Sequence, residues 1–166
     1  SAIRLAKRLE PFDPLWFEEP VPPENKGEMA RVAQSTSIPV ASGERLATKY
    51  EFAELLDRQA AAILQPALGR VGGILEAKKI AGMAEAYHAT VSPHNAWGPL
   101  LTAIHVQLAA AIPNFLVLEY RLDPRDKIAK NPLKVENGYI QVPDGPGIGV
   151  EFDEEAALRF PYEPRG

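Results

Sequence analysis

The stretch PVASGERLATKYEFAELLDRQAAAILQP, residues 39–66, contains one strand–helix–strand unit that decides the fold. Its two ends, residues 39–43 and 61–65, are short apolar runs followed by turn residues, a pattern typical of buried strands. Between them, residues 48–58 have apolar side chains at helical spacing. Because a helix connects the two strands, the unit predicts parallel pairing with a crossover connection.

The same unit recurs along the chain at intervals of roughly 25 residues, the length of one strand, one helix and two short loops. Further strands are expected at residues 15–18, 90–93 and 115–119. Further helices are expected at residues 2–9, 26–34, 73–87 and 99–111. The helix at 73–87 is expected to place five apolar residues on one face: Ile74, Ala77, Ile80, Ala81 and Ala84.

Continuous apolar strands predict a parallel sheet that helices cover, which is compatible with an open doubly wound sheet or with part of a barrel. Periodicity alone does not separate the two folds. Nearly every expected strand ends in a polar residue, and barrel enzymes place their catalytic groups at the carboxyl ends of several strands. We therefore predict an α/β fold of the (β/α)8, TIM-like barrel type.

The repeating pattern stops after residue 132, and a second region is expected at residues 133–166. Residues 134–142 contain Asn137-Gly138, which predicts a hairpin closed by a type I′ turn. The segment that follows is rich in Gly and Pro and has little periodicity. We expect the hairpin and tail to pack back on the barrel or on a capping domain outside this sequence.

Composition excludes several classes of function. The 166 residues are 46% hydrophobic and 24% charged with a net charge of −4, and they contain no block of basic residues for nucleic acid or anionic lipid. With no cysteine, any metal must use oxygen or imidazole ligands. The most apolar stretch, residues 106–118, is too short to cross a bilayer, and no signal peptide is recognisable. We expect a soluble cytoplasmic protein that acts on a small molecule.

The expected strand ends bring together a set of chemically useful side chains: Glu18, Glu44, His94 and Glu119. Two carboxylates on adjacent strands form a hard oxygen site that suits Mg²⁺. The histidine and the third glutamate would face that site across the mouth of the barrel. The sequence therefore predicts a metal-assisted active site.

Five motifs in order carry a family resemblance: WFEEPVPPEN (16–25), ASGERLATKYEF (41–52), LQPALGRVGGILEAKKIAGMAEAY (64–87), VSPHNAWGP (91–99) and LVLEY (116–120). They resemble the fourth to eighth strand segments of the mandelate racemase branch of the enolase superfamily, and most closely its galactonate-dehydratase-like acid-sugar dehydratases. The resemblance covers residues 2–119 and implies the C-terminal half of the barrel. It also implies that the third-strand aspartate and the N-terminal capping domain have no counterpart here, because residue 1 falls inside the helix after that strand.

The resemblance assigns a role to each strand-end residue. Glu18 and Glu44 are metal ligands for Mg²⁺, His94 is the general base or acid, and Glu119 helps to hold the charge that develops on the substrate carboxylate. The implied reaction is proton abstraction next to the carboxylate of a sugar acid, followed by loss of water. The alternatives are a racemase or epimerase of a 2-hydroxy acid and a non-catalytic, truncated barrel. We also expect a homo-oligomer.

One position departs from the family pattern. The sixth-strand aspartate that orients the histidine in this branch would fall at Ala67, directly after Pro66. Without that carboxylate, His94 lacks the partner that fixes its tautomer. We expect either that another residue takes its place or that catalysis is weakened.

Other polar residues have simpler interpretations. Glu19 is expected to pair with a nearby cation such as Arg45, and His88 is expected in a loop. His105 lies inside an apolar helix, which favours a packing role. Asn95 either lines the pocket or packs its loop.

Overall fold

The fold is described from a computed structural model that covers residues 1–121 and 127–161. Its helical elements are α1 (Ala2–Leu9), η1 (Glu10–Phe12), α2 (Lys26–Ala33), α3 (Lys49–Asp57), α4 (Ile74–Ala86), α5 (Pro99–Ala110) and α6 (Glu154–Ala157). Its strands are β1 (Phe17–Glu18), β2 (Val40–Ser42), β3 (Ile63–Leu64), β4 (Thr90–Val91), β5 (Val135–Glu136) and β6 (Tyr139–Ile140). The order of the first four strands and their helices is the alternation that the sequence predicts.

Strands β1 to β4 form one parallel sheet in sequence order. Glu18 lies beside Ala41, Ser42 beside Leu64, and Leu64 beside Val91. Because parallel strands in register end at the same edge, the residues after each strand are brought together. The predicted parallel α/β fold is confirmed.

The predicted fifth strand, residues 115–119, is only partly formed. Phe115 makes a single parallel bridge to Val91, and the amide of Leu116 donates to the carbonyl of Val91 at 2.9 Å. The following residues make no ladder in the described part of the chain, and Leu116 and Val117 are exposed. A strand that has a neighbour on one side only makes fewer ladder hydrogen bonds, so its apolar run alone overestimated its length.

The other strands are also shorter than predicted. Residues 39–43 were expected in one strand, whereas the observed strand, β2, begins at Val40. Pro39 has no N–H to donate, although its carbonyl accepts from the amide of Phe17 at 2.8 Å. At the other end of the strand, Gly43 has a φ of 140°, which ends the extended geometry.

The helices differ from prediction mainly at their caps. Thr48 and Glu51 form a capping box at the start of α3, so the expected first residue of that helix is its N-cap. In α4, Ala77, Ile80, Ala81 and Ala84 are buried as predicted. Ile74 is 44% exposed, so its placement on the buried face was wrong. It occupies the first helical position, at the rim of the packed face. Among the described residues, no helix is long and apolar enough to cross a bilayer.

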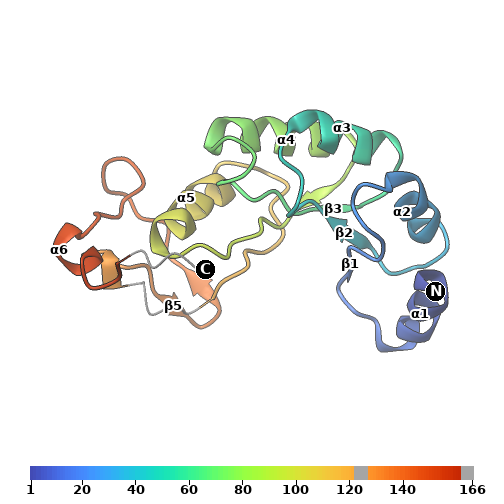
Figure 1. Cartoon of the computed structure of the whole chain (residues 1–166), viewed down its shortest axis with the longest axis horizontal. Helices are drawn as coiled ribbons and strands as arrows, with labels where there is room; N and C mark the ends of the chain where they lie inside the picture. The colour runs from blue at the N-terminus through green and yellow to red at the C-terminus, as the bar shows by residue number, and fades with distance from the viewer. Residues whose placement is uncertain (122–126, 162–166) are drawn as a thin grey trace.

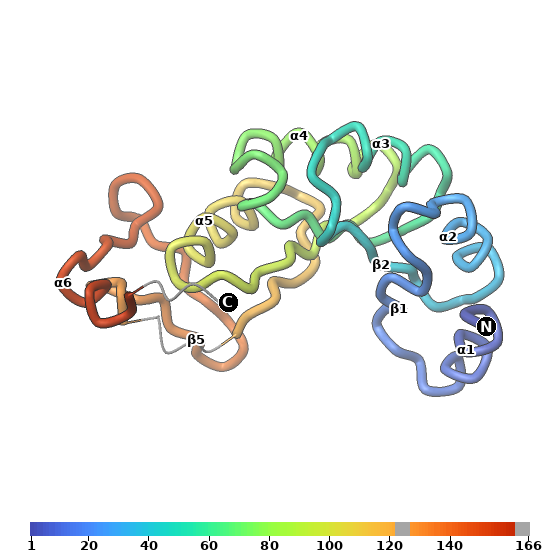
Figure 2. The backbone as a smooth tube through the Cα atoms, viewed as in Figure 1, coloured from blue at the N-terminus to red at the C-terminus, as the bar shows by residue number. Residues whose placement is uncertain are grey.

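The helices α2 to α5 follow one another along the outer side of the strands (Figure 1). The core lies between the helices and the sheet, where Phe52 and Leu55 of α3 meet Leu64 of β3 and Ile80 of α4. Helix α1 and segment α6 lie at opposite ends of the molecule (Figure 2). Burial of the helices against one side of the sheet leaves the strand ends free to carry polar groups.

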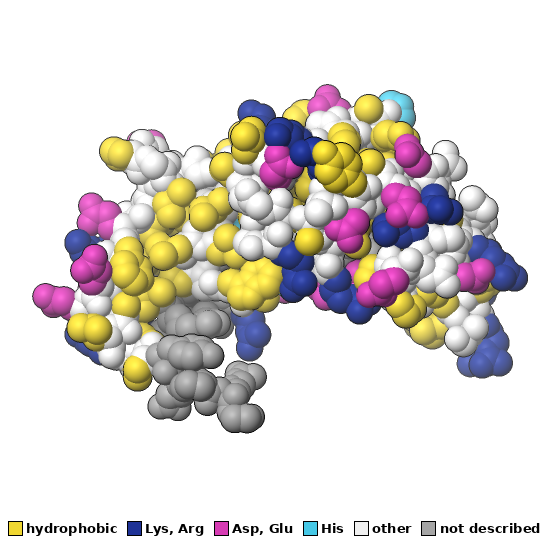
Figure 3. Space-filling view, turned by 45° about the horizontal axis from the view of Figure 1, so that its top comes forward, with side chains coloured by type: hydrophobic (Ala, Val, Ile, Leu, Met, Phe, Trp, Pro, Cys, Tyr) yellow, Lys and Arg dark blue, Asp and Glu magenta, His cyan; other side chains and the backbone are white. Residues whose placement is uncertain are grey.

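The predicted hairpin is confirmed. Strands β5 and β6 pair antiparallel, and Asn137 and Gly138 both have positive φ, at 52° and 82°, as a type I′ turn requires. Gln107 of α5 donates from Nε2 to the carbonyl of Pro143 at 3.0 Å, which links the segment after the hairpin to the last long helix. Figure 3 shows hydrophobic side chains gathered on the half of the molecule where α5 and this region lie.

Gly43 lies close to α3 and to the turn after β3. A Cβ atom there would lie 2.7 Å from Cε1 of Phe52 and 3.0 Å from the backbone nitrogen of Gln65. Phe52 is fully buried and cannot move aside without opening the core. The glycine therefore lets β2 turn closely past α3 just before Glu44.

Gly43→Ala should lower the free energy of unfolding by on the order of 2–4 kcal/mol, because strain at positive φ adds to overpacking against Phe52. Gly82→Ala is the matched control, since no atom lies within 4 Å of its added Cβ and it lies in α4. That change should stabilise by about 0.5–1 kcal/mol. Urea unfolding of both variants measures the difference. Equal stability of the two variants would contradict this packing account.

Candidate active site

A pocket of about 300 Å³ lies at the carboxyl ends of the strands. It gathers side chains that are distant in sequence but follow neighbouring strands. Its lining consists of Trp16, Glu18, Glu44, Gln65, Ser92, Pro93, His94, Val117, Leu118 and Glu119. The structure thus brings all four predicted site residues into one pocket.

Glu18 ends β1 and is held by two donors. Nε1 of Trp16 donates to its Oε2 at 3.0 Å, and Nε2 of Gln65 donates to the same oxygen at 2.7 Å. Gln65 is only 6% exposed, so this amide is a fixed part of the pocket wall. Sequence reasoning identified Gln65 as the end of a strand but missed that it holds Glu18.

Glu19 points to a different partner. Its carboxylate accepts from Nε of Arg45 at 2.9 Å and from Oγ of Ser42 at 3.3 Å. The predicted pairing of Glu19 with Arg45 is confirmed. Glu19 follows the last residue of β1 and has a positive φ of 36°, so the backbone turns at this residue and the two adjacent glutamates reach different partners.

His94 stands between two carboxylates. Its Nδ1 lies 2.7 Å from Oε2 of Glu119 and 3.4 Å from Oε2 of Glu44. The ring also makes an edge contact with Trp97, with 5.3 Å between centroids. The imidazole is therefore positioned by groups from the loop after β2, its own loop and the segment after Phe115.

Glu119 is anchored by the loop that carries His94. The backbone amide of Asn95 donates to its Oε2 at 2.9 Å, and Nδ2 of Asn95 donates to its carbonyl at 3.1 Å. Nδ2 of Asn95 also lies 3.0 Å from Oγ1 of Thr102 in α5. Both Asn95 and Thr102 are buried. Asn95 is not among the residues that line the pocket, and its burial confirms the expected packing role. The sequence did not predict that Asn95 also positions Glu119.

The donor set suits a hard divalent cation only in part. Glu18 and Glu44 offer carboxylates from neighbouring strand ends, and in the described residues Oε1 of Glu18 accepts no hydrogen bond. Mg²⁺ prefers one or two carboxylates together with water and substrate oxygens. Within residues 1–121 and 127–161, no group of three or more acidic or histidine side chains is arranged to hold a metal. The two glutamates fit as part of a magnesium site.

His105 is fully buried in α5 behind this pocket. Its Nδ1 lies 2.7 Å from the carbonyl of Leu101, and its Nε2 accepts from the amide of Leu68 at 3.5 Å. Burial lowers the pKa of His105 to about 4, although the contact with Leu101 acts in the opposite direction. The ring is therefore neutral near pH 7, and the expected packing role is confirmed. His88 is exposed in the loop before β4.

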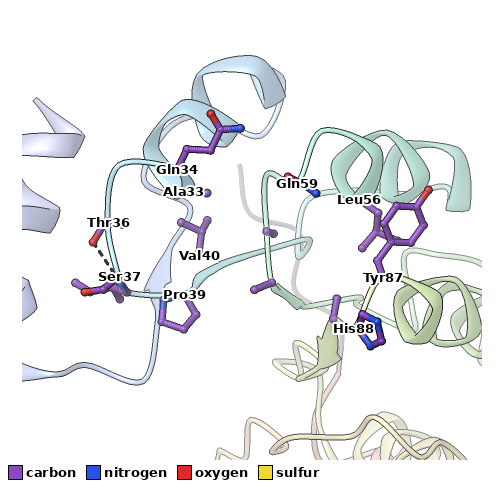
Figure 4. Close-up of a pocket in the computed structure, with 14 residues that line it drawn as sticks. Ala33, Gln34, Thr36, Ser37, Pro39, Val40, Leu56, Gln59, Tyr87 and His88 are labelled. Carbon is purple, nitrogen blue, oxygen red and sulfur yellow. Dashed lines mark hydrogen bonds between the residues drawn. The ribbon is translucent and has the colours of Figure 1, made fainter.

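A second pocket, of about 430 Å³, opens at the opposite ends of the strands (Figure 4). Its polar lining residues are Gln34, Thr36, Ser37, Gln59, Tyr87 and His88, and the others are apolar. No Asp, Glu, Lys or Arg is among its lining residues. Although it is larger, it lies at the ends of the strands where barrel folds carry stability and not catalysis. The smaller pocket is the candidate active site.

Residues 1–156 match the family model described as "Enolase C-terminal domain-like". Among curated proteins, the chain is 42% identical to D-xylonate dehydratase of Haloferax volcanii, over 94% of this chain and 39% of the relative. It is 38% identical to D-galactonate dehydratase of Variovorax paradoxus, over 96% of this chain and 44% of the relative. The chain thus spans about two fifths of the length of the curated relatives it matches.

Solved structures share the fold closely. A mandelate racemase/muconate lactonizing enzyme-like protein from a Roseovarius species has a TM-score of 0.95 and 54% identity, over 99% of this chain and 42% of that chain. An enolase from Agrobacterium radiobacter, described with bound Na and L-malate, has a TM-score of 0.89 and 39% identity, over 95% of this chain and 44% of that chain. The described strands and helices therefore have the arrangement found in these barrel proteins.

Stability should fall in mild acid because of His105. Its folded pKa of about 4 lies below its ordinary 6.5, so it contributes stability above pH 6.5 that is lost as the pH falls toward 4. The loss between pH 7 and pH 4.5 should be on the order of 2–3 kcal/mol. Urea unfolding at several pH values measures it.

His105→Gln should remove that part of the pH dependence, whereas His88→Asn should retain it because His88 is exposed. Asparagine suits the positive φ of 57° at residue 88. An unchanged pH profile in His105→Gln would show that another group causes the acid sensitivity.

Proposed function

Because the chain belongs to the enolase C-terminal domain-like family, we propose that the protein containing it is a Mg²⁺-dependent dehydratase of a sugar acid. The observation that carries the proposal is the convergence of Glu18, Glu44, His94 and Glu119 in one pocket. Relatives named as dehydratases of xylonate and galactonate support the substrate class. A neighbour described with bound L-malate, a hydroxy acid, is in keeping with it.

Glu18 and Glu44 would hold the Mg²⁺ from adjacent strand ends, with a further ligand from outside the described residues. When bound, the ion supplies electrostatic stabilisation for the negative charge that develops on the substrate carboxylate. Trp16 and Gln65 keep Glu18 in place through their hydrogen bonds to its Oε2. This fixed carboxylate would need little reorganisation during the reaction.

His94 is the proposed base. The C–H bond next to the substrate carboxylate breaks, its proton moves to the imidazole, and the electron pair is delocalised into the carboxylate. The bond from the neighbouring carbon to its hydroxyl then breaks, and the proton on His94 leaves with that hydroxyl as water. The resulting enol becomes a 2-keto-3-deoxy acid, and the imidazole returns to its neutral form.

A racemase or epimerase would use the same proton abstraction and return the proton to the other face of the carbon. The dehydratase names of the relatives favour loss of water. A non-catalytic role would not account for the convergence of three carboxylates and a histidine in one pocket.

The predicted cytoplasmic location stays a prediction. The predicted homo-oligomer also stays a prediction.

His94→Asn should lower the turnover of a sugar acid by about 10²–10⁴-fold, the contribution of a general base, in the protein that contains this chain. Formation of 2-keto acid from a panel of sugar acids in the presence of Mg²⁺ measures it. His88→Asn, at the opposite ends of the strands, should leave the rate unchanged. Proton exchange without 2-keto acid would favour racemisation, and full activity of His94→Asn would refute the assignment of the base.

A further inference from the structure

The position of His94 raises the question of what orients its ring. The family pattern places an orienting carboxylate at residue 67, where this chain has alanine. Ala67 is fully buried, and the amide of the next residue, Leu68, donates to Nε2 of His105. The turn after β3 therefore contacts α5 through a neutral histidine and offers no carboxylate to His94.

The carboxylates that do reach His94 both face the same nitrogen. Oε2 of Glu119 lies 2.7 Å from Nδ1, and Oε2 of Glu44 lies 3.4 Å from it. An ionised carboxylate only accepts hydrogen bonds, so a nitrogen that faces two of them is favourable only when it carries a proton. In the described residues, Nε2 of His94 has no hydrogen-bond partner. This geometry corresponds to the tautomer with the proton on Nδ1 and a free lone pair on Nε2.

Glu119 is better placed than Glu44 to fix this tautomer. Its distance to Nδ1 is within the range of a charge-assisted hydrogen bond, whereas 3.4 Å is long for one. The same Oε2 accepts the backbone amide of Asn95, the residue directly after His94. The loop that carries the histidine thus also holds the carboxylate that orients it.

Buried hydrogen bonds also hold the backbone of Glu119 in place. Nδ2 of Asn95 donates to the carbonyl of Glu119 and to Oγ1 of Thr102. Oγ1 of Thr102 in turn donates to the carbonyl of Gly98 at 2.9 Å. Asn95 is 3% exposed, so these bonds are shielded from water and hold residue 119 against the loop.

We propose that Glu119 is the positioning residue that holds His94 in the tautomer with a basic Nε2, in place of the carboxylate that residue 67 lacks. The proposal rests on the proposed function for its use in catalysis, because it assigns Nε2 as the atom that receives the substrate proton. Glu119 then acts through His94. This differs from the charge-holding role that the resemblance implies.

Long-range ¹H–¹⁵N correlation spectra of ¹⁵N-labelled protein report which nitrogen of a neutral histidine carries the proton. In the parent protein, that is, the unsubstituted protein that contains this chain, neutral His94 should show a protonated Nδ1 and an unprotonated Nε2. Glu119→Ala should lose this preference and shift toward protonated Nε2, the tautomer that a free imidazole favours in water. The side chain of Glu119 is 46% exposed, so its truncation leaves the core packing in place.

Glu44→Gln is the matched control, because it removes the charge of the other carboxylate near Nδ1 and should preserve the tautomer. Protonated Nε2 in the parent protein, or an unchanged tautomer in Glu119→Ala, would overturn the proposal. Loss of the preference in Glu44→Gln but not in Glu119→Ala would assign the role to Glu44 and overturn it as well. These spectra do not depend on turnover, so their outcome is separate from that of the dehydratase proposal.

Kinetics provide a second test in the protein that contains this chain. Because Glu119 already orients the histidine, Ala67→Asp should not raise the turnover of a sugar acid. If His94 instead lacked an orienting partner, the restored carboxylate would raise turnover by tenfold or more. Such an increase would therefore contradict the proposed role of Glu119.

Discussion

The candidate site depends on the parallel register of four short strands. Each pair of strands shares only two residue positions, and Glu18, Ser42 and Leu64 stand at the same edge of the sheet. A shift of one residue in any pair would turn side chains to the other face and separate the carboxylates. Close packing maintains the register, since Gly43 leaves no space between β2 and Phe52 of α3.

The chemistry available at the strand ends depends on the charged side chains gathered there and on their partners. Three carboxylates and an imidazole share a pocket of about 300 Å³, and each has a defined partner or neighbour. Glu18 is fixed by neutral donors, whereas Glu119 and Glu44 face His94. In the proposed mechanism, Glu18 and Glu44 would bind the metal ion, while Glu119 would orient His94 for proton transfer.

The sequence predicted the parts of the fold and site that local pattern encodes. Apolar periodicity predicted the order of strands and helices, and the linked motifs predicted that Glu18, Glu44, His94 and Glu119 would meet. Contacts between distant residues were not predictable in this way. The partner of Nδ1 of His94 depends on where residue 119 lies after a strand that barely forms. The role of Gln65 depends on a side chain that reaches across to β1. No local signal encodes either contact.

If the pocket at the carboxyl ends of the strands is a metal-assisted active site, a divalent cation should bind there. Anomalous diffraction from crystals of the protein containing this chain, soaked with Mn²⁺ as a substitute for Mg²⁺, would locate the ion. We expect an anomalous peak within coordination distance of carboxylate oxygens of both Glu18 and Glu44. A Mn²⁺ ion bound elsewhere, with neither glutamate as a ligand, would contradict it.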